Sequence, residues 1–245
     1  GGFSHNQFAL TIARELENPY PDYVGLNLTR EVLAGQDHRA NKGSVIVPSL
    51  EVQLVDAADS MTYDSHDTDD AVKLNFVSLD DLAEVTLTGR LLGEIRRDFS
   101  SADPRAIRRR LAHDLIDWQV TDLLSTTMSR LAQTNFASSE EARAAGFKLT
   151  TSETLRREKA ELEKFLYARV YRHKELIRVR SDAQNRLRTL FDYFVANPET
   201  LPERSQERAD LVGIHGAVRD YLGSMTDRYC DQQFRSISAT HAERN

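Results

Sequence analysis

Hydrophobic residues along the chain recur at helical spacing. Phe8, Ile12 and Leu16 follow one another at intervals of four residues. A longer stripe of the same kind consists of Ile107, Leu111, Leu115, Trp118 and Leu123. Residues three or four apart share one side of an α-helix, whereas a half-buried strand needs strict alternation, of which the chain contains little. The pattern therefore predicts an all-α protein.

Capping residues and prolines mark where these helices begin and end. Side chains that favour the N-cap position precede several apolar stretches, at Ser4, Thr29, Ser78, Asp103 and Ser152. Pro104 follows Asp103 and suits the first helical position. Proline excludes a continuing helix after Asn18 and after Asn197. We predict a loop over residues 133–149 and one final helix from about Arg208 to Phe234.

The helix predicted over residues 48–74 carries the most informative chemistry. Its apolar residues Leu50, Leu54, Val55, Ala58 and Met61 predict a buried side. Asp59, Tyr63 and Asp67 recur every four residues, so they share a side that borders this stripe. Carboxylates beside a core are costly unless a metal ion or a sugar hydroxyl satisfies them. The alternative is an exposed acidic face, because Asp56, Asp64, Asp69 and Asp70 are nearby, and the pattern alone favours it.

Two further places contain polar residues that suit a nucleotide, and a third place carries a His-Asp pair. His5, with Asn6, falls in the first turn of a helix, where a histidine can meet phosphate oxygens, although an isolated terminal histidine is more often just exposed. The segment 171–174, Tyr-Arg-His-Lys, suits a polyanion with a sugar or base, or is an ordinary basic helix end. His113 and Asp114 lie in a strongly periodic helix, where we expect solvated surface.

Composition narrows the class of protein. The 245 residues include 38 acidic and 32 basic ones, which gives a net charge of -6 and argues against a nucleic-acid binder over its whole surface. Arginine clusters at 105–110 and 178–188 leave local nucleic-acid contact as a hypothesis. The single cysteine, Cys230, excludes an intrachain disulfide and fits a cytoplasmic location. No apolar run is long enough for a membrane span.

Taken together, several segments resemble the deoxyguanosinetriphosphate triphosphohydrolase-like proteins of the HD superfamily. The similarity runs in family order through residues 2–7, 25–31, 51–70, 165–173 and 220–229. It implies an all-α HD-superfamily helical bundle, represented here by its C-terminal portion with appended C-terminal helices. The chain has no initiator methionine, so we expect it to be part of a longer protein. We expect residues 1–135 to complete the catalytic domain and residues 136–245 to complete the nucleotide site and the subunit contacts.

The resemblance also implies roles for individual residues. Asp59 matches the last ligand of a divalent metal (Mg, Mn or Fe type), whose other ligands we expect before residue 1. His5 matches an active-site histidine. The residues expected to contact the substrate are Tyr63 and Asp67 at the deoxyribose, Tyr171 near the sugar and base, Asn6, and His66.

The implied reaction is metal-dependent hydrolysis of a deoxynucleoside triphosphate to deoxynucleoside and tripolyphosphate. The implied assembly is a homo-oligomer, with a hexamer as the family expectation. One alternative is a truncated, non-catalytic subunit that binds nucleotide or supports assembly, because one aspartate cannot hold a catalytic metal alone. Another is a helical nucleic-acid-binding regulator that uses the arginine clusters, whose DNA binding would be salt-sensitive and survive loss of Asp59.

Overall fold

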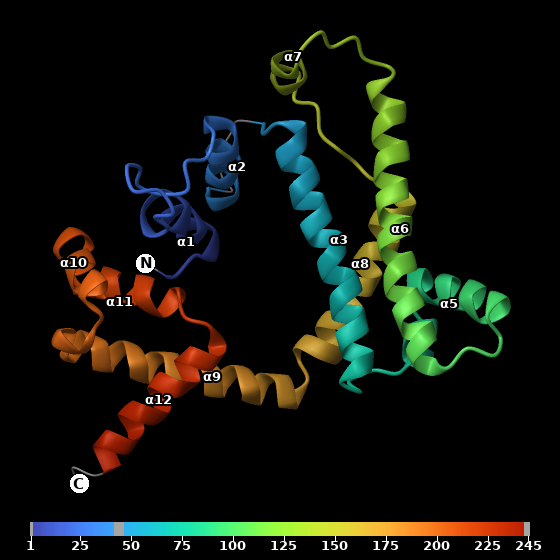
Figure 1. The fold of residues 1–245 in the computed structure, drawn as a ribbon. Helices are drawn as coiled ribbons and strands as arrows, with labels where there is room; N and C mark the ends of the chain where they lie inside the picture. Colours follow the sequence, from blue (N-terminus) through green and yellow to red (C-terminus); the bar gives the residue numbers. More distant parts are fainter. Residues whose placement is uncertain (1, 42–46, 243–245) are drawn as a thin grey trace. The chain divides into compact units, whose positions relative to one another are not determined.

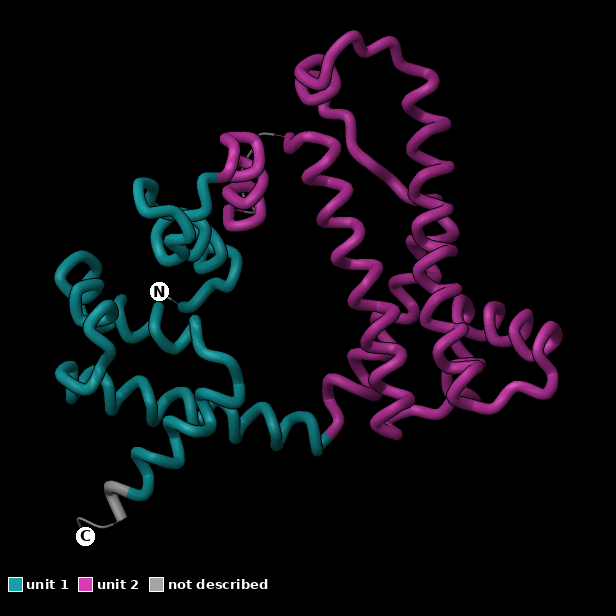
Figure 2. Tube along the Cα trace, viewed as in Figure 1, with its two compact units in different colours: residues 1–27, 174–245 teal, residues 28–173 magenta. Residues whose placement is uncertain are grey.

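The computed structural model describes residues 2–41 and 47–242, and these residues form helices and no strand. The predicted all-α fold class is confirmed (Figure 1). The chain divides into two compact units: one comprises residues 1–27 and 174–245, and the other residues 28–173 (Figure 2). This division rests on packing alone. The predicted functional boundary between residues 135 and 136 stays a prediction.

The unit of residues 28–173 is built around two long helices that pack against each other, α3 (Leu50–Lys73) and α6 (Pro104–Leu131). Its remaining helices are α2 (Arg30–Ala40), α4 (Leu79–Ala83), α5 (Thr86–Asp98), α7 (Ser139–Ala144), α8 (Glu153–Leu166) and the π-helix η2 (Tyr167–Tyr171). α5 and α8 pack against each other, α5 also contacts α6, and α8 also contacts α3. Leucines fill the core between these helices, among them Leu87, Leu92, Leu111, Leu115, Leu155 and Leu162.

The helix starts predicted from capping residues are confirmed. The side chains of Thr29, Asp103 and Ser152 each accept a hydrogen bond from a backbone N–H of the first turn. Ser78 and Asp81 form a reciprocal capping box, in which each side chain bonds the other residue's backbone N–H. Local side-chain hydrogen bonds therefore set these boundaries, and such signals can be recognised in sequence.

The buried side of α3 differs from the prediction. Leu54 and Val55 are 45% and 55% exposed, whereas the buried residues are Met61, Asp64, Ser65, Thr68 and Ala71. The hydroxyls of Ser65 and Thr68 donate to the carbonyls of Met61 and Asp64, at 3.0 and 2.6 Å. Because these hydroxyls are satisfied within the helix, small polar residues can face α6 and α8 without penalty. The predicted apolar stripe is therefore wrong for the first half of α3.

Two predictions near α6 also need correction. Trp118 is 39% exposed, and the Arg90 guanidinium lies 4.0 Å from its ring, while Gln119 takes the buried position. The segment predicted as loop over residues 133–149 contains the short helix α7, which is capped by Ser138. A helix of six residues with little apolar periodicity gives a weak sequence signal.

The other unit pairs the N-terminal segment with the C-terminal helices. It contains α1 (His5–Thr11) with the π-helix η1 (Ile12–Leu16), α9 (Lys174–Ala196), the 3₁₀ turn η3 (Pro198–Thr200), α10 (Glu203–Val212), α11 (Ile214–Gly223) and α12 (Asp227–Ala242). Its core includes Leu190, Phe194, Leu201, Val218 and Ile237.

The single final helix predicted from Arg208 to Phe234 is wrong, because the chain breaks twice within it. Gly213 has φ +76°, a left-handed conformation that ends α10, and a non-helical segment separates α11 from α12. The break predicted after Asn197 is confirmed, since α9 ends at Ala196. No helix among the described residues combines the length and apolar character needed to cross a bilayer.

Candidate functional site

The candidate site is built on α3, where Asp59, Tyr63 and Asp67 lie one turn apart on one side. Tyr63 is 62% exposed, so its ring is available to a ligand, whereas Asp67 is half-buried. The predicted sharing of one helix side follows from the helical spacing, since α3 runs unbroken through all three residues. This side faces away from the buried residues Met61, Ser65 and Thr68.

Asp67 and Tyr171 meet across α3 and η2, although 104 positions separate them in the sequence. The Tyr171 hydroxyl donates a hydrogen bond to Oδ2 of Asp67. Burial and this hydrogen bond raise the pKa of the Tyr171 phenol well above its usual value, so the phenol stays protonated and remains a donor. The bond fixes the carboxylate while occupying only one of its roughly four acceptor positions. The structure thus joins Asp67, predicted to lie at the deoxyribose, to Tyr171, predicted to lie near the sugar and base.

A buried ion pair lies next to this contact. Asp64, only 6% exposed, is paired with Lys159 of α8, whose Nζ also lies 3.0 Å from Oε1 of Glu163. Burial raises the pKa of Asp64, and the pairing with Lys159 opposes that rise. Negative charge on Asp67 and Asp64 in turn helps to raise the pKa of Tyr171. The pair joins α3 to α8 one turn from Asp67, so it fixes the helices that carry the Asp67–Tyr171 contact.

Asp59 is held by an arginine of α2. Arg39 Nη2 lies 2.6 Å from Asp59 Oδ2, and Arg39 Nε lies 2.9 Å from Asp56 Oδ1. One guanidinium therefore bridges two carboxylates on successive turns of α3. The Asp59 side chain remains 46% exposed, so a cation could approach it from solvent.

Carboxylate oxygens are the ligands that hard divalent cations prefer, and Asp59 fits as one member of such a set. Within residues 2–41 and 47–242, no group of three or more His, Cys, Asp or Glu side chains has an arrangement that would hold a metal. The expected role of Asp59 as a metal ligand therefore stays a prediction.

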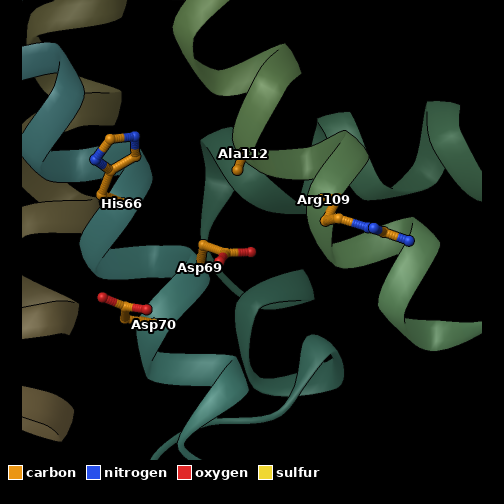
Figure 3. Close-up of a pocket in the computed structure, with 5 residues that line it drawn as sticks. All are labelled: His66, Asp69, Asp70, Arg109 and Ala112. Carbon is orange, nitrogen blue, oxygen red and sulfur yellow. The ribbon is translucent and has the colours of Figure 1, made fainter.

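His66 faces a different environment from Asp67. It lines an open cavity of about 370 Å³ between α3 and α6, together with Asp69, Asp70, Arg109 and Ala112. Figure 3 shows His66, Asp69 and Asp70 on α3, with the Arg109 side chain extending away from them. His66 thus lines the cavity beside α6, whereas its neighbour Asp67 bonds Tyr171 of η2. Its predicted contact with the substrate stays a prediction.

His5 and Asn6 belong to the other compact unit, at the first turn of α1. Ser4 caps this helix, since its hydroxyl accepts from the backbone N–H of Gln7 at 3.4 Å. His5 is exposed and Asn6 half-buried. A histidine at a helix N-terminus lies beside backbone N–H groups that favour anions, which agrees with a phosphate contact. Both predicted roles stay predictions.

The polar segment 171–174 begins with Tyr171, the last residue of η2. The ring of His173 lies 4.5 Å from that of Phe76, and the rings of Tyr167 and Tyr171 lie 6.5 Å apart at 74°. His173 therefore packs against an aromatic ring, while Tyr171 turns to Asp67. The segment was predicted either to bind a ligand or to be an ordinary helix end. Tyr171 belongs to the candidate site, whereas His173 belongs to the helix end.

Arginines in the two basic clusters pair with acidic neighbours. Arg110 binds Asp114 at 2.7 Å and Arg186 binds Asp231 at 2.5 Å. Arg108 Nε lies 2.9 Å from Asp69 Oδ1. His113 is exposed, as predicted, with 73% of its side chain accessible. These pairs satisfy much of the local positive charge, and the nucleic-acid hypothesis stays a prediction.

Sequence reasoning missed Arg39, Asp64 and Lys159. Lys159 and Glu163 are spaced like an ordinary surface pair, and Asp64 was grouped with an exposed acidic face. The available signal was the repeat of small or polar residues at 64, 65, 68 and 71, which marks the buried side of α3. Their partners are 20 and 95 positions away, beyond the reach of local patterns.

Comparison with known proteins adds the family context. A family described as the phosphohydrolase-associated domain matches residues 149–236. Proteins named deoxyguanosinetriphosphate triphosphohydrolase-like are 31% identical in Leptospira interrogans and 33% identical in Bordetella pertussis and in Caulobacter sp. strain K31. Each comparison covers 97% of this chain, which spans 65–67% of the length of these relatives.

Proposed function

Since this chain belongs to the deoxyguanosinetriphosphate triphosphohydrolase-like family, we propose that the protein hydrolyses deoxynucleoside triphosphates such as dGTP to deoxynucleoside and tripolyphosphate. The relatives carry triphosphohydrolase-like names, which do not favour a non-catalytic subunit. The proposal includes a divalent metal, of the Mg, Mn or Fe type, with Asp59 among its ligands. It also includes assembly into a homo-oligomer.

The observation that carries the proposal is the hydrogen bond from Tyr171 to Asp67. It preorganises a carboxylate beside an exposed tyrosine, Tyr63, one turn away on α3. A fixed acceptor next to an aromatic surface suits a sugar that offers one hydroxyl and one apolar face. Asp67 accepts the hydrogen bond of the 3′-hydroxyl, and Tyr63 packs where a 2′-hydroxyl would otherwise lie.

In the proposed reaction, water attacks the α-phosphorus and the bond to the 5′ oxygen breaks. A new P–O bond forms on tripolyphosphate, and the 5′ oxygen takes up a proton to become the hydroxyl of the deoxynucleoside. In this reaction the role of His5 is to assist proton transfer and charge neutralisation at the phosphates, and Asn6 follows it in the chain. A divalent cation held by Asp59 together with further ligands would neutralise phosphate charge and activate water.

Replacing Tyr63 by alanine should reduce the preference for dGTP over GTP. Removing the ring opens the space that excludes the 2′-hydroxyl, and a steric contact of this size is worth about 10- to 100-fold in relative kcat/KM. The measurement is kcat/KM for dGTP and GTP with the wild type and the variant. Tyr20→Ala, which removes another half-exposed tyrosine far from α3 in sequence, is the control. An unchanged ratio in Tyr63→Ala would refute the sugar-reading role.

A further inference from the structure

The N-terminal helix α1 lies against α11 through an unusually close contact. A Cβ atom added at Gly223 would lie 2.8 Å from both Cε1 and Cζ of the Phe8 ring. Phe8 is 7% exposed, and its ring also lies 5.5 Å from that of Phe3. A buried aromatic ring has little freedom to move away, so only glycine at position 223 lets Phe8 approach this closely.

A second contact links the same two segments through charge. The carboxylate of Asp220, only 3% exposed, accepts hydrogen bonds from Arg208 at 3.0 Å and Arg219 at 2.7 Å. Arg208 also pairs with Glu15 of η1 at 2.7 Å. A guanidinium with several donors in one plane can bridge two carboxylates, and here it joins α11 to the segment that continues α1. Removing the Arg208 guanidinium would leave the buried Asp220 carboxylate with one hydrogen-bond partner fewer.

The chain after η1 returns to the same segment. Gly25 has φ +86°, and a Cβ there would lie 2.6 Å from the Ala13 carbonyl oxygen. The backbone N–H of Leu26 donates to that same carbonyl at 2.8 Å. The loop therefore holds η1 at Ala13, and α11 contacts α1 at Phe8. α1 has only seven helical residues, too few to be stable alone.

We infer that α11 positions the active-site end of α1, with Gly223 receiving the Phe8 ring and Asp220 holding Glu15 through Arg208. The inference rests on the proposed function for the role of His5, which begins α1 three residues before Phe8. Gly223 and Asp220 are positioning residues, because they act through Phe8 and through the Arg208–Glu15 pair. They give a physical role to the 220–229 segment of the family resemblance, to which the proposed chemistry assigns none.

Gly223→Ala tests the steric contact. Hydrogen–deuterium exchange of residues 2–16 should rise about tenfold, because the methyl group displaces Phe8, while exchange in residues 50–166 stays unchanged. Gly93→Ala is the matched control, since Gly93 also lies in a helix and a Cβ there meets nothing within 4 Å. In a Phe8→Leu background, which makes room for the methyl group, Gly223→Ala should add less than about twofold. Unchanged exchange of residues 2–16, or the same increase in both backgrounds, would overturn the inference.

Glu15→Gln tests the charged link without disturbing the buried Asp220–Arg208 pair. Exchange should rise in residues 12–16 and stay constant in α11, and an unchanged rate in residues 12–16 would refute the link.

Catalysis supplies an independent readout. Gly223→Ala should lower kcat for dGTP with KM unchanged, and should lower it no further in a His5→Ala background; additive losses in that background would overturn positioning through His5. Absence of dNTP hydrolysis by the wild-type protein would refute the proposed function. The hydrogen–deuterium exchange results alone decide whether α11 holds α1.

Discussion

Asp59→Asn should abolish hydrolysis of dGTP, with kcat falling by at least about a thousandfold. An amide has the shape of the carboxylate but lacks its charge, so it is a poor ligand for a divalent cation. The side chain is 46% exposed and belongs to no packed core, so the fold should persist. The measurements are dGTP turnover, metal content of the purified complete protein, and the unfolding midpoint in urea.

Asp56→Asn is the matched control for this prediction. Asp56 lies on the same helix, one turn earlier, and pairs with the same arginine at 2.9 Å. It should retain turnover within about threefold, because surface ion pairs contribute little. Full turnover in Asp59→Asn would contradict the assignment of Asp59 as a metal ligand. Equal losses of turnover in both variants would instead mean that the carboxylates act by pairing with Arg39 and so by fixing the position of α2.

Lys159→Met should destabilise the protein by about 3–5 kcal/mol, because it leaves the Asp64 carboxylate buried without its cation. Asp64 is 6% exposed and its partner comes from α8, so the loss also weakens the packing of α3 on α8. The loss of stability is measured by urea unfolding of the protein, monitored by Trp118 fluorescence or by hydrogen–deuterium exchange in residues 28–173. The double variant Asp64→Asn with Lys159→Met should recover most of the loss, since no buried charge remains.

The pH dependence of this effect has a definite sign. Burial raises the pKa of Asp64 above its ordinary value of 3.8, so the folded state binds the proton more tightly than the unfolded state. The stability that this proton supplies is complete below the unfolded pKa and is lost as pH rises through the folded one. Lys159 opposes the rise in pKa. Its removal should therefore cost least in acid and progressively more as pH rises.

Glu163→Gln separates the buried partner of Lys159 from the exposed one. Glu163 is half-exposed and shares the same Nζ at 3.0 Å, so its loss should cost less than about 1 kcal/mol. A cost as large as that of Lys159→Met would mean that the surface pair, and not Asp64, dominates.

Local patterns predicted most of the fold, and their failures have physical causes. Caps such as Ser78 with Asp81 act within a few residues and were found. The buried side of α3 was misread because Ser65 and Thr68 satisfy their hydroxyls within the helix and so look solvent-facing in sequence. Gly213 was missed as a break because a glycine inside an apolar pattern is often tolerated.

The candidate site was only partly accessible from the sequence. Spacing placed Asp59, Tyr63 and Asp67 on one side of a helix, but their meaning came from the family resemblance. The approach of Tyr171 to Asp67 depends on how α8 and η2 pack, which no local pattern encodes. Arg39 and Lys159 were missed for the same reason, since each pairs with a carboxylate far away in sequence.

Product analysis with the purified, metal-loaded protein distinguishes release of tripolyphosphate from other cleavage of dGTP. dGTP and GTP are incubated separately with wild type and with Asp67→Asn, and the products are resolved by anion-exchange chromatography. We expect equimolar deoxyguanosine and tripolyphosphate from dGTP, far less reaction with GTP, and a marked loss of dGTP turnover in Asp67→Asn. Release of pyrophosphate or orthophosphate in place of tripolyphosphate, or equal turnover of dGTP and GTP by the wild type, would contradict it.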